Sequence, residues 1–541
     1  MYAFHVTVPA GVSAIDVTFD FLSPASESGF TSAASGTPHL YLLTWNQLLL
    51  YPQGSKSDDV TFHASLELPA GWKFGTPLPI ASSAGAQVDF SPVSLTTLVD
   101  SPVIMGEYFR VVPLDTGDRS VEMDIAADSA AALEISPELT DKMKRLVAEA
   151  DALFGARHFT HYHFLLTLSD HVAHFGLEHH EANDTRMSER ALIDETLGNL
   201  SLWVLSHEFV HSWNGKYRRP AGLATPDFQA PMRGELLWVY EGLTEYLGAL
   251  LAARSGLWTP KQYDERLAEV AASFDHIPGR TWRPLIDTAV AAQLLYQAPG
   301  EWSSYRRSVD FYDEGWLLWL EADTLIRQQT DGKRSLDDFC HRFHGGASGA
   351  PAVVPYTFDD VIAALNQVTP YDWRGFWTTR LHTTEAPAPL GGLERGGWRL
   401  TYDEKPNDAI SDQAKGERKV VEAAYSLGLW IKAEDGAIRE AIPGMPAFKA
   451  GVRPGMKLVA VNGRKWSPDI LSDHLKAGKS APGALELLVE DGELYRTLAV
   501  DYHDGLREPH LVRDEAKPDL LAAIIAPHAA PAAPVAATAR Q

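Results

Sequence analysis

Short runs in which apolar and polar residues alternate occupy the first 128 positions of the chain. They include HVTVPAG, IDVTFDFL and VTFHASLELP, and Pro and Gly residues separate them. Alternation with a period of two is typical of strands that bury one face and expose the other. The pattern therefore predicts an N-terminal β-sandwich domain over residues 1–128.

From residue 129 the apolar residues recur at helical spacing. PELTDKMKRLVAEADALFG predicts a long helix, HYHFLLTL predicts a strand, and LLWVYEGLTEYLGALLAARSG predicts another helix, which Gly256 ends. The apolar positions of this last stretch are Leu236, Val239, Tyr240, Leu243, Leu247 and Leu250. Such a mixture indicates a mixed, largely helical domain over residues 129–385.

The pattern changes again after residue 385. TTEAPAPLGGLERGG is rich in Pro and Gly and predicts a linker, which together with a connecting strand spans 386–420. SLGLWIKAEDG, AGVRPGMKLVAVNG and a helical pattern at 468–477 predict a small module over 421–505. Residues 506–541 form a tail whose Ala- and Pro-rich end is expected to be disordered. The chain is thus expected to be a multidomain α+β protein.

Length and composition agree with several packed domains and exclude two kinds of partner. The chain has 541 residues, of which 45% are hydrophobic, so it can bury more than one core. Its formal net charge of −24 repels nucleic-acid phosphates. The most apolar run, 520–539, is interrupted by Pro527, Pro531 and Pro534. We therefore expect no nucleic-acid binding and no membrane span.

The N-terminus and the cysteine content bear on the compartment. Cys340 has no second cysteine with which it could form an internal disulfide. MYAFHVTVPAG is neither basic nor followed by the apolar core of a signal peptide. The sequence as given predicts a soluble cytoplasmic protein.

The stretch LSHEFVHSWNGKYRRP contains the pattern H-E-x-x-H at residues 207–211. Residues four apart lie on one face of a helix, so His207 and His211 can bind the same metal ion. Glu208 points to the side of that ion, where a carboxylate can take a proton from a bound water. The alternative is a pair of core histidines with an exposed Glu208. The spacing favours a metal site that cuts peptide bonds.

A third ligand is expected on a second helix, because a catalytic zinc usually takes three protein ligands and His2Glu is a recurrent set. Glu241 is an acid within the apolar stripe of residues 236–256, and a buried carboxylate without a cation is costly. Glu241 is therefore the expected ligand. Glu245, four positions later, is either an outer partner that orients a ligand histidine or an exposed helix acid.

HEFVHSWNGKYRRP followed by LWVYEGLTEYL resembles the glycyl aminopeptidase family of PDZ-containing zinc metallopeptidases, which are gluzincins related to thermolysin. The resemblance extends over most of the chain. It includes YLLTWNQLLLYPQG near the start, FGLEHHEAN at 175–183, DFYDEGWLLWLEADTLIR at 310–327 and MPAFKAGVRPGMKLVAVNG at 445–463. It implies a thermolysin-like catalytic domain and a C-terminal PDZ domain.

The resemblance also implies a site for the reaction. One zinc ion per chain would lie on His207, His211 and Glu241. Glu208 would be the general base and later the proton donor.

Two further side chains are implied to bind the substrate. Tyr312 resembles the tyrosine that donates a hydrogen bond to the scissile carbonyl oxygen, where negative charge develops, and Tyr305 is its substitute. Glu178, in GLEHH, resembles the acid that binds the free α-amino group of the substrate. Its alternative is an ordinary loop carboxylate.

The PDZ resemblance predicts a peptide partner, bound as an added strand with its carboxylate on backbone amides. Leu427, Gly428 and Leu429 are the matching positions. The alternative is a module that only packs against the catalytic domain. Members of the family usually carry a further leading segment, so the first domain is expected to be incomplete at its start. With a leading signal segment the compartment would be periplasmic or secreted.

Three functions follow from these residues. The first is a zinc aminopeptidase that removes small N-terminal residues, with Gly or Ala favoured by the resemblance. The second is a zinc endopeptidase, which would also cleave peptides whose N-terminus is acetylated. The third is a PDZ adaptor with a vestigial metal site. The intact set of His207, Glu208, His211 and Glu241 argues against the third.

Overall fold

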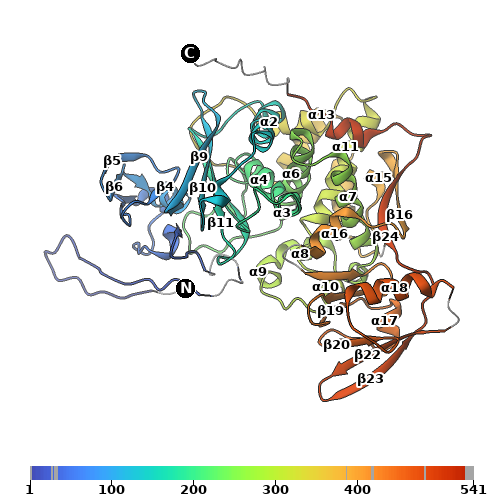
Figure 1. Cartoon of the computed structure of the whole chain (residues 1–541). Helices are drawn as coiled ribbons and strands as arrows, with labels where there is room; N and C mark the ends of the chain where they lie inside the picture. The colour runs from blue at the N-terminus through green and yellow to red at the C-terminus, as the bar shows by residue number, and fades with distance from the viewer. Residues whose placement is uncertain are drawn as a thin grey trace, which may run out of the picture.

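The computed structural model describes residues 3–529, apart from 26–28, 30–33, 386, 416–418 and 481–482. A β-rich N-terminal part is followed by a helical central domain with a five-stranded sheet, and then by a C-terminal module (Figure 1). The central domain lies between the other two parts. The expected multidomain α+β organisation, with a β-rich start and a helical central domain, is confirmed.

Three small antiparallel sheets form the N-terminal part. Its elements are β1 (Leu40–Leu43), β2 (Thr61–Phe62), β3 (Ser65–Glu67), β4 (Lys73–Gly75), β5 (Ile80–Ala84), β6 (Gln87–Phe90), β7 (Val93–Ser94), α1 (Leu95–Val99) and β8 (Val103–Gly106). The sheets β1-β8-β4 and β3-β6-β5 share one core, to which Leu43, Val88 and Met105 contribute.

The first two stretches with strand-like alternation, 5–11 and 15–22, contain no strand or helix. Val6 is 59% exposed and Val17 is 54% exposed. A strand is stabilised by hydrogen bonds and side-chain pairs with a neighbouring strand. No strand in the described part of the chain pairs with these stretches, so the prediction of strands is not confirmed there.

A five-stranded mixed sheet supports the site, with the strand order β12-β13-β11-β10-β9. Its strands are β9 (Tyr108–Asp115), β10 (Val121–Ala127), β11 (Tyr162–Leu168), β12 (Phe175–Glu178) and β13 (Ala182–Met187). β10 pairs in parallel with β11, so the sheet runs across the domain boundary predicted at residue 128. β12 is an edge strand that is antiparallel to β13 and packs beside α4 (Trp203–Val210).

Helices make up most of the rest of the central domain. They are α2 (Pro137–Phe154), α3 (Glu195–Ser201), α5 (Leu237–Tyr240), α6 (Gly242–Ser255), α7 (Pro260–Asp275), α8 (Leu285–Val290), α9 (Ala292–Leu295), α10 (Ser303–Arg306), α11 (Asp313–Gln329), α12 (Leu336–Phe343), α13 (Phe358–Val368), α14 (Trp373–His382) and α15 (Gly391–Arg395). The two short strands β14 (Arg218–Pro220) and β15 (Val354–Tyr356) pair in parallel. The helix predicted at 236–256 is broken at Glu241, between α5 and α6.

Two glycines of α6 set how closely its neighbours approach. A Cβ at Gly248 would lie 2.9 Å from Cα of His207, and a Cβ at Gly242 would lie 2.9 Å from Cα of Gly315. Both distances are shorter than van der Waals contact. Because glycine has no Cβ, α6 can run directly against α4 on one side and α11 on the other.

The C-terminal region folds into a module and then returns to the central domain. Its elements are β16 (Trp398–Asp403), α16 (Asp408–Lys415), β17 (Val420–Ala423), β18 (Leu429–Lys432), β19 (Ile438–Ala441), α17 (Pro446–Lys449), β20 (Lys457–Val461), β21 (Arg464–Lys465), α18 (Pro468–Gly478), β22 (Leu485–Asp491), β23 (Leu494–Val500), β24 (Glu508–Arg513) and α19 (Leu520–Ile525). The sheets β17-β18-β19 and β21-β20-β22-β23 enclose a core of their own.

The tail after the module packs on the central domain. β24 pairs with β16 beside α7, and the Arg254 guanidinium of α6 donates to the Ile524 carbonyl of α19. The end of the tail, 530–541, for which disorder is predicted, lies outside the described residues. Among the described helices, none has the length and apolar character needed to cross a bilayer.

Candidate active site

Helix α4 carries the H-E-x-x-H pattern, and His211 follows its last turn in helical conformation. The Ser206 hydroxyl donates to the Gly248 carbonyl across 2.8 Å, which joins α4 to α6. With the close approach at Gly248, this contact holds His207 against the helix that follows Glu241.

Three basic atoms meet between these helices. His207 Nε2 and His211 Nε2 are 3.2 Å apart, and Glu241 Oε2 lies 3.7 Å from the first and 3.1 Å from the second. All three residues are buried. Glu241 Oε2 makes no hydrogen bond of good geometry within the described part of the chain. The three residues named from the sequence as metal ligands are therefore together, and their atoms lie close enough to share one ion.

Outer partners fix the orientation of both imidazole rings. His211 Nδ1 lies 2.9 Å from the Asn214 carbonyl oxygen, and His207 Nδ1 lies 3.0 Å from Glu245 Oε2. The Asn214 carbonyl is an acceptor, so the His211 ring holds a proton on Nδ1. Glu245 is an ion-pair partner of His207 Nδ1, without a hydrogen bond of good geometry. Neutral rings would direct their two Nε2 lone pairs at the point that the Glu241 carboxylate also faces. For Glu245, the geometry favours the orienting partner over the exposed acid, since the side chain is 5% exposed.

We call His207, His211 and Glu241 the cluster. Its electrostatics favour a positive charge at the point where the two Nε2 atoms and Glu241 Oε2 meet. Burial lowers the pKa of His207, but contacts with Glu241 and Glu245 outweigh it and raise that pKa well above the ordinary value. Burial raises the pKa of Glu241, yet His211 and His207 bring it down to about 2. Protonating both rings would bring two Nε2–H groups together at 3.2 Å. One divalent cation satisfies all three bases, so the donor set fits a metal ion.

Glu208 is buried beside the edge strand β12. A Cβ at Gly176 would collide with the Glu208 carboxyl group, so the strand approaches the acid closely. Burial is the main cause that raises the pKa of Glu208 to about 7, opposed by His207 and His211. A carboxyl group that titrates near neutral pH can both accept and return a proton.

Glu178 ends strand β12 next to the same cluster. Its Oε1 accepts a hydrogen bond of 2.5 Å from the Tyr240 hydroxyl, and Tyr240 directly precedes Glu241. Atoms of Glu178, Glu208 and His211 lie within 4.8 Å of one another. The structure thus brings Glu178 to the cluster and not to a distant loop.

Tyr312 precedes α11, and its ring stacks on that of His207 with 6.2 Å between the centroids. Its hydroxyl lies 2.5 Å from the hydroxyl of Tyr296. Tyr305, the substitute named from the sequence, is 51% exposed, and its ring lies beside Trp282. Of the two predicted tyrosines, the structure brings Tyr312 to the cluster.

Sequence reasoning did not identify Tyr240 or Tyr296 as site residues. Tyr240 belongs to the apolar stripe of the second helix, where a tyrosine is expected to be a core residue. Tyr296 lies in QLLYQAP, which matches no motif, and only the fold of the α8–α9 segment places it by Tyr312.

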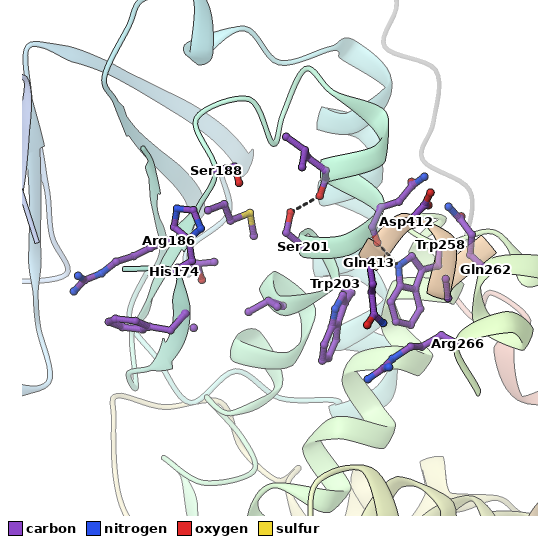
Figure 2. Close-up of a pocket in the computed structure, with 18 of the residues that line it drawn as sticks. His174, Arg186, Ser188, Ser201, Trp203, Trp258, Gln262, Arg266, Asp412 and Gln413 are labelled. Atoms are coloured by element: carbon purple, nitrogen blue, oxygen red, sulfur yellow. Dashed lines mark hydrogen bonds between the residues drawn. The ribbon is translucent and has the colours of Figure 1, made fainter. Parts of the chain in front are cut away.

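A cavity of about 520 Å³ is lined in part by Gly176, which packs against the Glu208 carboxyl group. Phe175 and Gly176 of β12 and Trp203 and Val204 of α4 line the side near the cluster. In Figure 2, His174 and Arg186 lie on one side of Trp203, and Trp258, Gln262 and Arg266 lie on the other. Helix α16, which leads to the C-terminal module, lines the cavity as well.

Of the three residues predicted to capture a peptide carboxylate, Leu427 and Gly428 lie in the turn before β18 and Leu429 is its first residue. Leu427 and Leu429 are buried, and Gly428 has a φ of 80°. The amides of Leu427 and Gly428 both donate to the Ala423 carbonyl. β18 is paired with β17 on one edge and with β19 on the other. An added strand could pair with β18 only after β17 or β19 leaves.

Comparisons with known proteins find two family models in the chain. The M61 glycyl aminopeptidase family model matches residues 201–318, and the model of the Peptidase M61 N-terminal domain matches residues 1–107. No curated protein matches the chain. Among solved structures, an aminopeptidase N family protein from Idiomarina loihiensis has a TM-score of 0.71 at 20% identity, over 90% of this chain and 83% of that one. An M1 zinc metallopeptidase from Deinococcus radiodurans has a TM-score of 0.42 at 17% identity, over 68% of this chain and 75% of that one.

The first family match contains His207, Glu208, His211, Glu241 and Tyr312, which are the residues that the fold brings together. The second covers most of the β-rich part. The likeness to the Idiomarina protein shows that the fold is shared over nearly the whole chain. The chain therefore contains an M61 glycyl aminopeptidase domain and the N-terminal domain of that family, and it is a metallo-aminopeptidase.

Proposed function

We propose that the protein is a zinc aminopeptidase that removes Gly or Ala from the N-terminus of peptides, with one zinc ion per chain on His207, His211 and Glu241. The observation that carries the proposal is the convergence of two Nε2 atoms and Glu241 Oε2 at one buried point. Two imidazoles and a carboxylate are a donor set of catalytic zinc. Bound there, zinc supplies a Lewis acid for the carbonyl group and makes a water more acidic. The family description supports the preference for Gly.

Glu208 is proposed to move the proton. Its carboxylate takes a proton from the attacking water, whose oxygen forms the new bond to the scissile carbonyl carbon. The proton then passes to the departing nitrogen as the C–N bond breaks, so Glu208 ends the reaction ionised, as it began. The pKa of about 7 suits a group that must act in both directions.

Tyr312 is proposed to donate a hydrogen bond to the carbonyl oxygen as negative charge develops on it. We expect Tyr312→Phe to keep its zinc and to lose about 10² to 10³ in turnover, the usual effect of removing one oxyanion donor. Turnover and zinc content measured on the same preparation check this. Tyr305→Phe is the matched control and should stay near the parent. Parental turnover in Tyr312→Phe would exclude this role.

Strand β12 is proposed to bind the substrate backbone along its edge. Glu178, at its end, would accept the free ammonium group, and Gly176 lies at Glu208, where the bond is cut. The residues after that bond would then extend into the cavity lined by Trp203 and Val204. A carboxylate is an economical receptor for an ammonium group and is left unpaired by a chain that continues past it.

Glu178→Ala is therefore expected to raise KM and lower turnover for substrates with a free amine, while zinc content stays unchanged. Peptides that are N-acetylated, already poor substrates, should lose little more. The measurement is the ratio of kcat/KM for a free and an acetylated glycyl peptide.

The control for this ratio is Glu181→Ala, because the Glu181 carboxylate binds the Thr160 amide instead of the cluster. An unchanged ratio in Glu178→Ala would show that Glu178 does not bind the amine. A parent enzyme that cleaves both peptides equally would be an endopeptidase.

We infer that residues 421–505 form a PDZ-like module, supported by the two small sheets, the helix α18 and the turn at Gly428. Its Tyr425 and Ile442 pack with Ala272 of α7. This contact supports the packing role of the module. Binding of a partner peptide as a strand beside Leu429 would require that β17 or β19 move away.

A further inference from the structure

Tyr296 follows the short helix α9 at the rim of the site. Leu295, next to it, is buried and anchors the segment, whereas Tyr296 is 56% exposed and Leu294 is 77% exposed. The Tyr296 hydroxyl nevertheless reaches the hydroxyl of Tyr312 at 2.5 Å. A half-exposed tyrosine thus makes a short polar contact with the residue proposed to stabilise the transition state.

The direction of this hydrogen bond is set once the reaction begins. A phenol hydroxyl has one proton to donate and can accept a hydrogen bond at the same time. When Tyr312 donates its proton to the developing oxyanion, its contact with Tyr296 can persist only with Tyr296 as the donor. Hydrogen bonds in such a chain polarise one another, so the outer donor strengthens the inner one.

We infer that Tyr296 is a positioning residue, which aims the Tyr312 hydroxyl at the oxyanion and strengthens it as a donor. The inference rests on the proposed function, because it needs Tyr312 to act on the scissile carbonyl. A tyrosine that only packed α9 against the site would affect folding or substrate affinity, and its effect would not depend on the hydroxyl of Tyr312.

A double-mutant cycle tests this dependence. Tyr296→Phe, Tyr312→Phe and the double variant are compared with the parent for kcat, KM, zinc content and Tm, with a glycyl substrate that has a free amine. We expect Tyr296→Phe alone to lower kcat roughly 2- to 10-fold, the value of one hydrogen bond, with KM nearly unchanged. In the Tyr312→Phe background the same substitution should cost nothing. Tyr305→Phe, about as exposed as Tyr296, is the control.

A phosphinic dipeptide, whose oxygen replaces the oxyanion, gives the same comparison as inhibition constants if turnover in the double variant is too slow. Equal losses in both backgrounds, or no loss in the parent background, would overturn the inference while the proposed function stands. A parent enzyme that is inactive on all free-amine substrates would instead overturn the proposed function, and the inference with it.

Discussion

Glu208→Gln is expected to keep its metal and to lose on the order of 10² to 10⁴ in turnover. Glutamine has nearly the same shape as glutamate, but its amide cannot take a proton from water and return it to the leaving nitrogen. Glu208 is not one of the three proposed metal ligands, His207, His211 and Glu241, so metal content should not change. Zinc per chain and turnover of glycine p-nitroanilide, measured on one preparation, separate the two effects.

The pH profile is the control for this assignment. Burial raises the pKa of Glu208 to about 7 in the metal-free protein, and the positive charge of a bound ion would lower it. The base must be ionised, so kcat/KM of the parent should fall as the pH drops through this pKa, at a value below 7. The residual activity of Glu208→Gln should lack this acidic limb. Parental turnover, or the same limb, would contradict the assigned role.

Glu241→Gln is expected to lose the metal itself. The two imidazoles would remain, but the anionic oxygen that lies 3.1 Å from His211 Nε2 would be replaced by a neutral amide. Two nitrogen ligands hold zinc much less firmly than the full set of three. After dialysis against a weak chelator, we expect about one zinc per chain in the parent and almost none in the variant, and activity should fall with the metal.

Glu245→Gln provides a graded comparison, because Glu245 touches His207 Nδ1 and not the convergence point. Loss of such an outer partner typically weakens metal binding 10- to 100-fold. The variant should therefore regain activity when zinc is added. Full zinc occupancy and full activity in Glu241→Gln would mean that another residue is the third ligand.

The parts of the site that the sequence could predict depend on local geometry. His207 and His211 share a face because a helix places residues four apart together. Glu241 could be named as a candidate because a buried acid in an apolar stripe is costly without a cation, and the fold brings it beside the two histidines. Tyr296 could not be found in this way, since its position beside Tyr312 depends on how the α8–α9 segment folds back over the site.

In the fold too, local patterns predict some features, whereas others depend on tertiary contacts. Alternation predicts a β-rich domain up to residue 128, but the pattern cannot reveal which strand pairs with which. β10 pairs with β11, beyond the predicted boundary at residue 128, because strand pairing is decided by tertiary contacts. The stretches 5–11 and 15–22 are the converse case, with a strand-like pattern and no neighbouring strand among the described residues.

If the C-terminal module binds a peptide as proposed, strand β17 makes that binding a competition. It covers one of the two edges of β18 to which an external peptide could add, and only five residues, 424–428, join the two strands. A segment tethered so closely acts at an effective concentration of about millimolar. A free peptide must therefore be present above this effective concentration, or bind β18 more tightly than β17 does. The selectivity of such binding would therefore depend on the sequence of β17 as well as on the strand edge that it covers.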